Sequence, residues 1–133
     1  MADYNKNDFN SILAYGQRLI GHAMRDFVDP SAVSGRDKGR LGAFLECYFG
    51  IPRNSTAMAD FESIGGVRLE LKTNPLKILS NGEIRIKERL VFNVINYFEI
   101  CNETWETSSF LAKNKNLLLV NFNIIIHFFW REV

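Results

Sequence analysis

The sequence predicts an α/β or α+β layered fold, in which two helices come first and a mixed set of strands follows. Apolar residues recur at helical spacing before residue 50, residues 67–73 alternate like a strand, and residues 117–129 are almost continuously apolar. The 133 residues, of which 47% are hydrophobic and 23% charged, are enough for one domain with a buried core. A net charge of +1 argues against a broad basic surface, so any contact with nucleic acid must be local.

The first part of the chain has the features of two helices. In residues 8–27, apolar side chains recur every three or four positions, and Asp8 is suited to cap the N-terminus. Residues 35–50 carry a second apolar stripe, which Gly50 and Pro52 bring to an end. Residues 51–66 are rich in helix-breaking residues and predict a loop.

The second part of the chain has the features of strands. Residues 67–73 alternate apolar and polar side chains, which is typical of a half-buried strand. Residues 74–100 predict a connection with one or two further strands, and the Asn-Gly-Glu at 81–83 suits a hairpin turn. Residues 101–115 predict a short helix or turn, and the apolar run at 116–129 predicts one last buried strand.

The strand at 67–73 carries the first chemical signal. Residues i and i+2 of a strand point the same way, so Glu70 and Lys72 share a face, and Asp60 precedes Glu70 by ten residues. Two carboxylates can hold Mg²⁺, and a neighbouring lysine can orient or deprotonate a water molecule that attacks a phosphodiester. A Glu-x-Lys triplet is short enough to occur by chance, so the triplet alone favours an ordinary solvated strand face.

The second predicted helix adds an independent signal. Lys38, Gly42 and Glu46 are spaced four apart and line one helical face, where a glycine would let another backbone approach closely. Glu46 lies beside the apolar stripe, where a carboxylate needs a partner. That partner could be a metal ion, the lysine of a nearby strand, or Arg18 or Arg25 of the first helix.

Three segments together resemble the MutH family, which comprises GATC-nicking mismatch-repair endonucleases and related GATC-cleaving type II restriction enzymes of the Sau type. The segment DKGRLGAFLECYFG resembles the family's Lys-Gly-x-x-Gly helix, which has an acidic residue four positions after the second glycine. ADFESIGGVRLELKTNP resembles its Asp-Phe…Glu-Leu-Lys-Thr-x-Pro block, and TWETSSFLAKNKNLLLV resembles its Trp-Glu-Thr-Ser segment. The resemblance implies a restriction-endonuclease-like core, a mixed β-sheet flanked by α-helices.

The resemblance also implies roles for individual residues. Asp60 and Glu70 match the metal ligands, with Mg²⁺ as the expected cofactor, and Lys72 matches the catalytic lysine. Because Asp60 and Glu70 are further apart here than in the mismatch-repair members, Glu62 is kept as an alternative to Asp60. The remaining expectations are Glu46 and Lys113 as supporting catalytic residues, Lys115 as the alternative to Lys113, and Lys38, Arg68 and Lys115 as DNA contacts.

The predicted function is therefore a Mg²⁺-dependent, restriction-type endonuclease that cleaves double-stranded DNA at GATC. A mismatch-repair nicking enzyme and a non-catalytic DNA-binding module of the same fold are the alternatives. We expect one catalytic domain over 1–133, with an N-terminal helix and turn at 1–35 and the core with its active site at 36–133. In the family a further C-terminal lobe reads GATC, so we expect a truncated C-terminus and a recognition lobe or second subunit as partner.

Other conspicuous residues have simpler interpretations. Cys47 and Cys101 lack the spacing of a zinc site and favour a reducing, cytoplasmic location without disulfides. Trp105 and Thr107 are interpreted as structural. His22 and His127 are far apart in sequence and are interpreted as packing or surface residues.

Overall fold

The structure, a computed structural model, describes residues 3–33, 37–53, 58–87, 89–92, 95–122 and 128–132, and for 37–39 and 128–132 it describes the backbone alone. Its centre is a four-stranded mixed sheet in the order β2-β1-β3-β4. The strands are β1 (Glu70–Ile78), β2 (Ile84–Ile86), β3 (Asn116–Phe122) and β4 (Phe128–Glu132). Parallel pairing of β1 with β3 and antiparallel pairing at both edges confirm the predicted mixed sheet.

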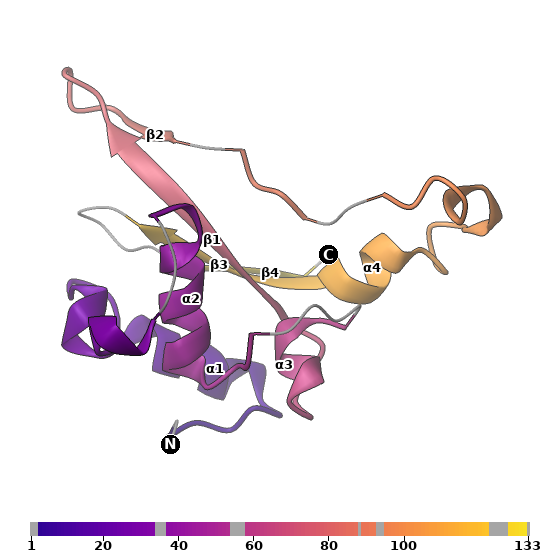
Figure 1. Ribbon diagram of the computed structural model, residues 1–133, viewed down its shortest axis with the longest axis horizontal. Helices are drawn as coiled ribbons and strands as arrows, with labels where there is room; N and C mark the ends of the chain where they lie inside the picture. The colour runs from indigo at the N-terminus through magenta and orange to yellow at the C-terminus, as the bar shows by residue number, and fades with distance from the viewer. Residues whose placement is uncertain are drawn as a thin grey trace.

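Helices flank this sheet (Figure 1). They are α1 (Phe9–Gln17), α2 (Asp37–Phe49), α3 (Asp60–Ser63) and α4 (Ser109–Asn114), with 3-10 turns at Met24–Asp26, Pro30–Ala32 and Ile100–Asn102. One core joins them to the sheet, because Ile12 of α1 and Leu45 of α2 are buried in the same cluster as Leu71 of β1 and Leu118 of β3. In Figure 1 the β1–β2 hairpin projects from the body, and the chain then arches away from the sheet before returning through α4.

The first helix is shorter than the predicted range 8–27. The Asp8 carboxylate caps it as expected, by accepting from the Asn10 N–H, but α1 ends at Gln17. The chain then turns at Gly21, whose φ of 79° lies in the left-handed region that glycine adopts without a steric penalty. The apolar residues beyond Gln17 still reach the core, since Leu19 and Met24 are buried. Their spacing thus reflected burial and not a continuous helix.

The predicted strand at 67–73 is displaced, because β1 starts at Glu70 and continues to Ile78 through Pro75. Proline has no backbone N–H to donate, but its carbonyl can still accept a hydrogen bond. At this position the Pro75 carbonyl accepts from the Lys87 N–H at 2.9 Å, so proline fits in the strand. The hairpin turn at 81–83 is confirmed: Gly82 has a φ of 83°, and its N–H donates to the Leu79 carbonyl.

Two further predictions need correction. The single last strand is in fact two antiparallel strands, β3 and β4, and residues 123–127 between them lie outside the described residues. The apolar run at 116–129 indicates burial, but it contains no glycine or proline that would mark where β3 ends and β4 begins. The predicted loop at 51–66 contains the short helix α3, whereas the short helix expected within 101–115 is present as α4.

A buried amide pair links the two parallel strands. Asn74 of β1 donates from its side-chain amide to Asn121 Oδ1 of β3 at 2.9 Å, and both residues are buried. We predict that Asn74→Ala lowers the free energy of unfolding by about 1–3 kcal/mol, because a buried acceptor loses its donor. Urea denaturation checks this, with exposed Ser80→Ala as the control that should change stability by less than about 0.5 kcal/mol. Equal stabilities of the two variants would contradict it.

Candidate active site

Asp60 and Glu70 are held together at the start of β1. Asp60 is the first residue of α3, so its N–H has no partner within that helix, and it donates to Glu70 Oε2 at 3.0 Å. In return, the Leu71 N–H donates to Asp60 Oδ2 at 2.9 Å. A backbone bond from the Phe61 N–H to the Leu69 carbonyl, 3.1 Å, fixes α3 against the strand. These reciprocal bonds place the two predicted metal ligands side by side.

Glu70 and Lys72 do not form a solvated strand face. Glu70 is only 3% exposed, and its Oε1 lies 3.3 Å from the Lys72 ammonium. Lys72 is itself largely covered and also donates to the Phe92 carbonyl at 3.1 Å. The solvated-face interpretation of the triplet is therefore wrong, because Glu70 is buried, Lys72 is half-buried, and both are bonded to specific partners.

A second lysine, from a part of the chain distant in sequence, lies near the Glu70 carboxylate. Lys113 on α4 lies 3.8 Å from Glu70 Oε1. Ser108 positions this helix, since its hydroxyl caps α4 by accepting from the Leu111 N–H at 3.1 Å. Lys115, the alternative, follows α4 and is exposed. The structure thus brings Lys113, and not Lys115, to Glu70.

Glu46 joins the group from α2. Its Oε2 lies 3.5 Å from Arg53 Nε, so its partner is an arginine just beyond the helix and neither Arg18 nor Arg25 of the first part of the chain. The same oxygen is buried and accepts no hydrogen bond. Burial raises the pKa of Glu46, as does the nearby charge of Asp60, and Arg53 opposes both. Sequence reasoning missed Arg53, which lies seven residues after Glu46 in a segment that has no periodic pattern.

The electrostatics of this cluster suit a bound cation. Burial also raises the pKa of Glu70, again with a contribution from Asp60, while Lys72 and Lys113 oppose the rise. A cation between these carboxylates would offset the repulsion from Asp60, which adds to the effect of burial on the pKa values of Glu46 and Glu70. Within the described residues no group of three or more His, Cys, Asp or Glu side chains is arranged to hold a metal ion. Two carboxylates are nevertheless enough for Mg²⁺, which keeps several water ligands and is completed by substrate phosphates.

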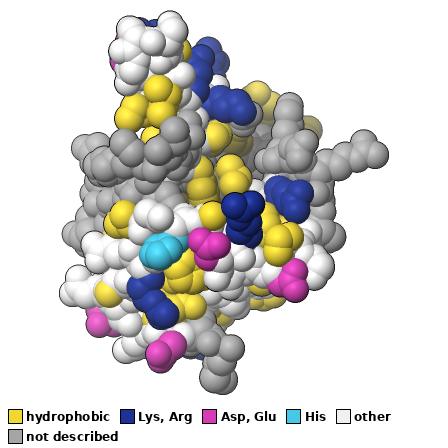
Figure 2. Space-filling view, turned by 90° about the vertical axis from the view of Figure 1, so that its left-hand side faces the viewer, with side chains coloured by type: hydrophobic (Ala, Val, Ile, Leu, Met, Phe, Trp, Pro, Cys, Tyr) yellow, Lys and Arg dark blue, Asp and Glu magenta, His cyan; other side chains and the backbone are white. Residues whose placement is uncertain are grey.

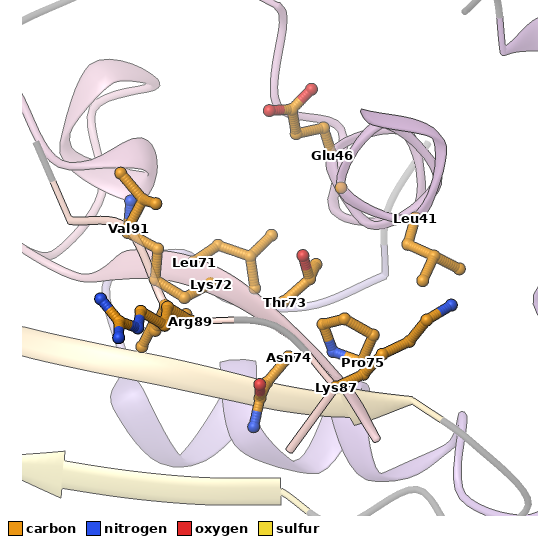
Figure 3. Close-up of a pocket in the computed structure, with 12 residues that line it drawn as sticks. Leu41, Glu46, Leu71, Lys72, Thr73, Asn74, Pro75, Lys87, Arg89 and Val91 are labelled. Carbon is orange, nitrogen blue, oxygen red and sulfur yellow. The ribbon is translucent and has the colours of Figure 1, made fainter. Parts of the chain in front are cut away.

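Beside the cluster a pocket of about 570 Å³ opens between α2, β1 and the segment after β2 (Figure 3). Lys72 is shared by the cluster and the pocket, and Glu46 projects from α2 towards the space above Leu71 and Thr73. Gly42 also lines it, but a Cβ at Gly42 would meet nothing within 4 Å. The expected close backbone contact at Gly42 is therefore wrong, and the missing side chain instead leaves the pocket open.

Comparisons with known proteins identify the family of this chain. Residues 49–124, more than half of the chain, match the family model described as "DNA mismatch repair enzyme MutH". The chain belongs to the MutH family. That match covers Asp60, Glu70, Lys72 and Lys113, while Glu46 lies just before it.

Individual relatives fall into both branches of the MutH family. The chain is 41% identical over 90 residues to the type II restriction enzyme Sau3AI of Staphylococcus aureus, a match that covers 68% of this chain and 18% of that enzyme. It is 32% identical over 115 residues to the DNA mismatch repair protein MutH of Shigella flexneri serotype 5b and of Escherichia coli O6:K15:H31. Those matches cover 82% of this chain and 47% of each relative, so the chain spans less than half of the relatives it matches.

The structure also places the remaining residues predicted from the MutH resemblance. Glu62, the alternative to Asp60, lies 3.6 Å from Arg68, and it therefore points to a surface ion pair and not to Glu70. The same pair neutralises Arg68, which weakens its candidacy as a DNA contact. The side chain of Lys38 lies outside the described residues.

The residues expected to be structural differ in their surroundings. Thr107 has the expected structural role, because it exchanges hydrogen bonds with Thr104 within a turn. Trp105 is 56% exposed, and its ring centroid lies 5.9 Å from that of Phe110, so it is less packed than expected. His22 is a surface residue with its ring against Phe27, and His127 is outside the described residues.

Two general expectations concern cysteines and membranes. Cys47 and Cys101 are both exposed and free, in agreement with the predicted lack of a disulfide. None of the helices in the described ranges is long and apolar enough to cross a lipid bilayer.

Proposed function

We propose that this chain carries the catalytic site of a Mg²⁺-dependent endonuclease that hydrolyses phosphodiester bonds of double-stranded DNA at GATC. The observation that carries the proposal is the buried contact of Glu70 with both Asp60 and Lys72 in a chain of the MutH family. The relatives, a type II restriction enzyme and DNA mismatch repair proteins, suggest the substrate class. The activity of those longer proteins is extended to this chain as part of the proposal.

In this proposal, Asp60 and Glu70 hold the metal ion. When bound, Mg²⁺ neutralises charge on the phosphate and makes a water molecule more nucleophilic. Lys72 lies next to Glu70 and has a second anchor at the Phe92 carbonyl, so its ammonium group is oriented before DNA arrives. It would orient the attacking water and stabilise the negative charge that develops on the phosphate. Lys113 supports the same charge from α4, and Glu46 lies at the edge of the metal site.

The restriction type is the preferred branch. The identity of 41% to the restriction enzyme exceeds the 32% to the mismatch-repair proteins, although the latter matches extend over more of this chain. Either branch requires groove-reading side chains. We propose that a further recognition lobe or a second subunit supplies them, and that residues 1–133 form one catalytic domain.

A plasmid cleavage assay tests the proposal. Supercoiled plasmid with GATC sites is incubated with the chain in Mg²⁺ or in EDTA, beside a plasmid in which these sites are destroyed. We expect metal-dependent cleavage, confined to the first plasmid once the groove-reading lobe or subunit is supplied. Linear product indicates the restriction type and open-circular product the nicking type. A folded chain that binds duplex DNA but never cleaves it would instead support the non-catalytic binding module.

Metal binding has a readout that is independent of cleavage. We predict that Mg²⁺ at about 100 times its dissociation constant stabilises the chain by about 2.7 kcal/mol, because the ion binds only the folded state. Thermal unfolding across a Mg²⁺ titration measures this. Asp60→Asn should abolish the stabilisation, whereas Glu62→Gln, which removes a nearby carboxylate paired with Arg68, should retain it. Loss of the response in the Glu62 variant alone would show that the metal ligands are assigned wrongly.

A further inference from the structure

We propose that Lys87 and Arg89 bind the phosphate backbone of the cleaved DNA strand in the pocket beside Lys72. The strand would then pass between α2 and the segment that follows β2, which we call the post-hairpin segment (residues 87 and 89–92). This inference rests on the proposed function, which it deepens by naming residues that hold the substrate.

The charges that line the pocket favour an anion. Three cations line it, namely Lys72, Lys87 and Arg89, and Glu46 is the one acidic residue among the lining residues of the described chain. Lys72 is already paired with Glu70, and Glu46 with Arg53. Lys87 and Arg89 form no ion pair within the described residues, so the pocket retains two uncompensated positive charges. A chain with a net charge of +1 thus concentrates free positive charge beside its catalytic lysine.

The backbone of β1 adds an uncharged hydrogen-bond donor to the same pocket, the Thr73 N–H. On the outer edge of β1, the Leu71 N–H is bound by Asp60, and the Pro75 carbonyl is bound by the Lys87 N–H. Because backbone groups of alternate residues in a strand face the same edge, the Thr73 N–H faces this edge between them. Thr73 also lines the pocket, and its side chain points into the gap below Glu46 (Figure 3). Backbone N–H groups are common phosphate ligands in protein–DNA complexes.

The other described cations around the site are less suitable. Arg68 is paired with Glu62, and Arg85 on β2 is bound by Glu83 through two hydrogen bonds of 3.1 and 3.2 Å. In Figure 2, Lys and Arg side chains gather near the projecting hairpin, so basic residues are present outside the pocket as well. What distinguishes Lys87 and Arg89 is their position in the pocket without an acidic partner among the described residues. Arg85, two residues before Lys87 and already neutralised, is therefore a matched control.

The test is the salt dependence of DNA binding by the whole chain. Fluorescence anisotropy with a labelled duplex containing GATC, in EDTA to prevent cleavage, gives the association constant between about 50 and 200 mM salt. Each lost phosphate contact should reduce the slope of log K against log salt by about 0.9 and weaken binding about fivefold at moderate salt. We expect this for Lys87→Ala and for Arg89→Ala, a doubled effect on the slope for the double variant, and little change for Arg85→Ala.

Three results would overturn the inference. If the wild-type chain binds duplex with a salt slope that Lys87→Ala and Arg89→Ala leave unchanged, these residues do not hold phosphate and the proposed function still stands. The same conclusion follows if Arg85→Ala weakens binding as much as either pocket variant. If the folded wild-type chain does not bind duplex at any salt concentration, both this inference and the proposed function fail together.

Discussion

Replacing Lys72 by methionine is expected to reduce the rate of DNA cleavage by about 10³-fold or more, the range for losing a positioned acid–base and charge-stabilising group. Methionine keeps most of the apolar stem, so packing is largely preserved while the ammonium group is lost. That group lies 3.3 Å from Glu70 Oε1 and 3.1 Å from the Phe92 carbonyl. Its position is thus fixed from two sides, and a mobile lysine elsewhere could not replace it.

Single-turnover cleavage at saturating Mg²⁺ measures this effect on the chemical step. Lys115→Met is the matched control at saturating DNA, because Lys115, an exposed lysine expected to contact DNA, should affect binding but leave the rate of the chemical step nearly unchanged. Lys113→Met should show a smaller loss than Lys72→Met, since its ammonium group lies further from Glu70, at 3.8 Å. If Lys72→Met cleaves at the wild-type rate while it still needs Mg²⁺, the catalytic role belongs to another cation.

The fold could be predicted where local patterns determine it. The second helix, the hairpin turn at Gly82 and the strand through Glu70 each depend on residues close in sequence, and each is present. The end of α1 at Gln17 and the division between β3 and β4 could not be predicted in this way. In both regions the apolar spacing reports burial, and burial continues through turns when the chain stays against the core.

The site shows the same limit. Asp60, Glu70, Lys72 and Lys113 were all named from the sequence, and the structure brings them together. What the sequence could not show is that Glu70 is buried, because α4, whose Lys113 lies near it, is distant in sequence. Nor could it show that Glu46 pairs with Arg53. The two residues are separated by the end of α2 and an irregular segment, where no regular spacing predicts which side chains meet.

Replacing Glu70 by glutamine is the second change with a large expected effect. Cleavage should fall by about 10³-fold or more, because the site loses an anionic oxygen that Mg²⁺ requires, while the side-chain volume is kept. The stabilisation by Mg²⁺ should also disappear. Glu62→Gln is the matched control, since it removes a carboxylate of the same type that is paired with Arg68. Cleavage and Mg²⁺ stabilisation that both survive in Glu70→Gln would exclude Glu70 as a ligand.

The same variant should change how stability depends on pH when the metal is removed. Burial and the charge of Asp60 raise the pKa of Glu70 above its ordinary value of 4.5, despite the opposing lysines. The folded state therefore binds this proton more tightly than the unfolded state, and the free energy of unfolding falls as pH rises from about 4.5 through the raised pKa. Glu70→Gln has no proton to lose there.

We accordingly expect the stability of Glu70→Gln, relative to wild type in EDTA, to increase steadily with pH across that window and then to level off. Urea denaturation at a series of pH values measures the difference directly. Adding Mg²⁺ should reverse it at neutral pH, because a bound cation favours the ionised carboxylate of the wild type. Parallel pH profiles for the two proteins in EDTA would mean that ionised Glu70 costs the fold nothing, and the electrostatic argument for a cation at this site would then lose its basis.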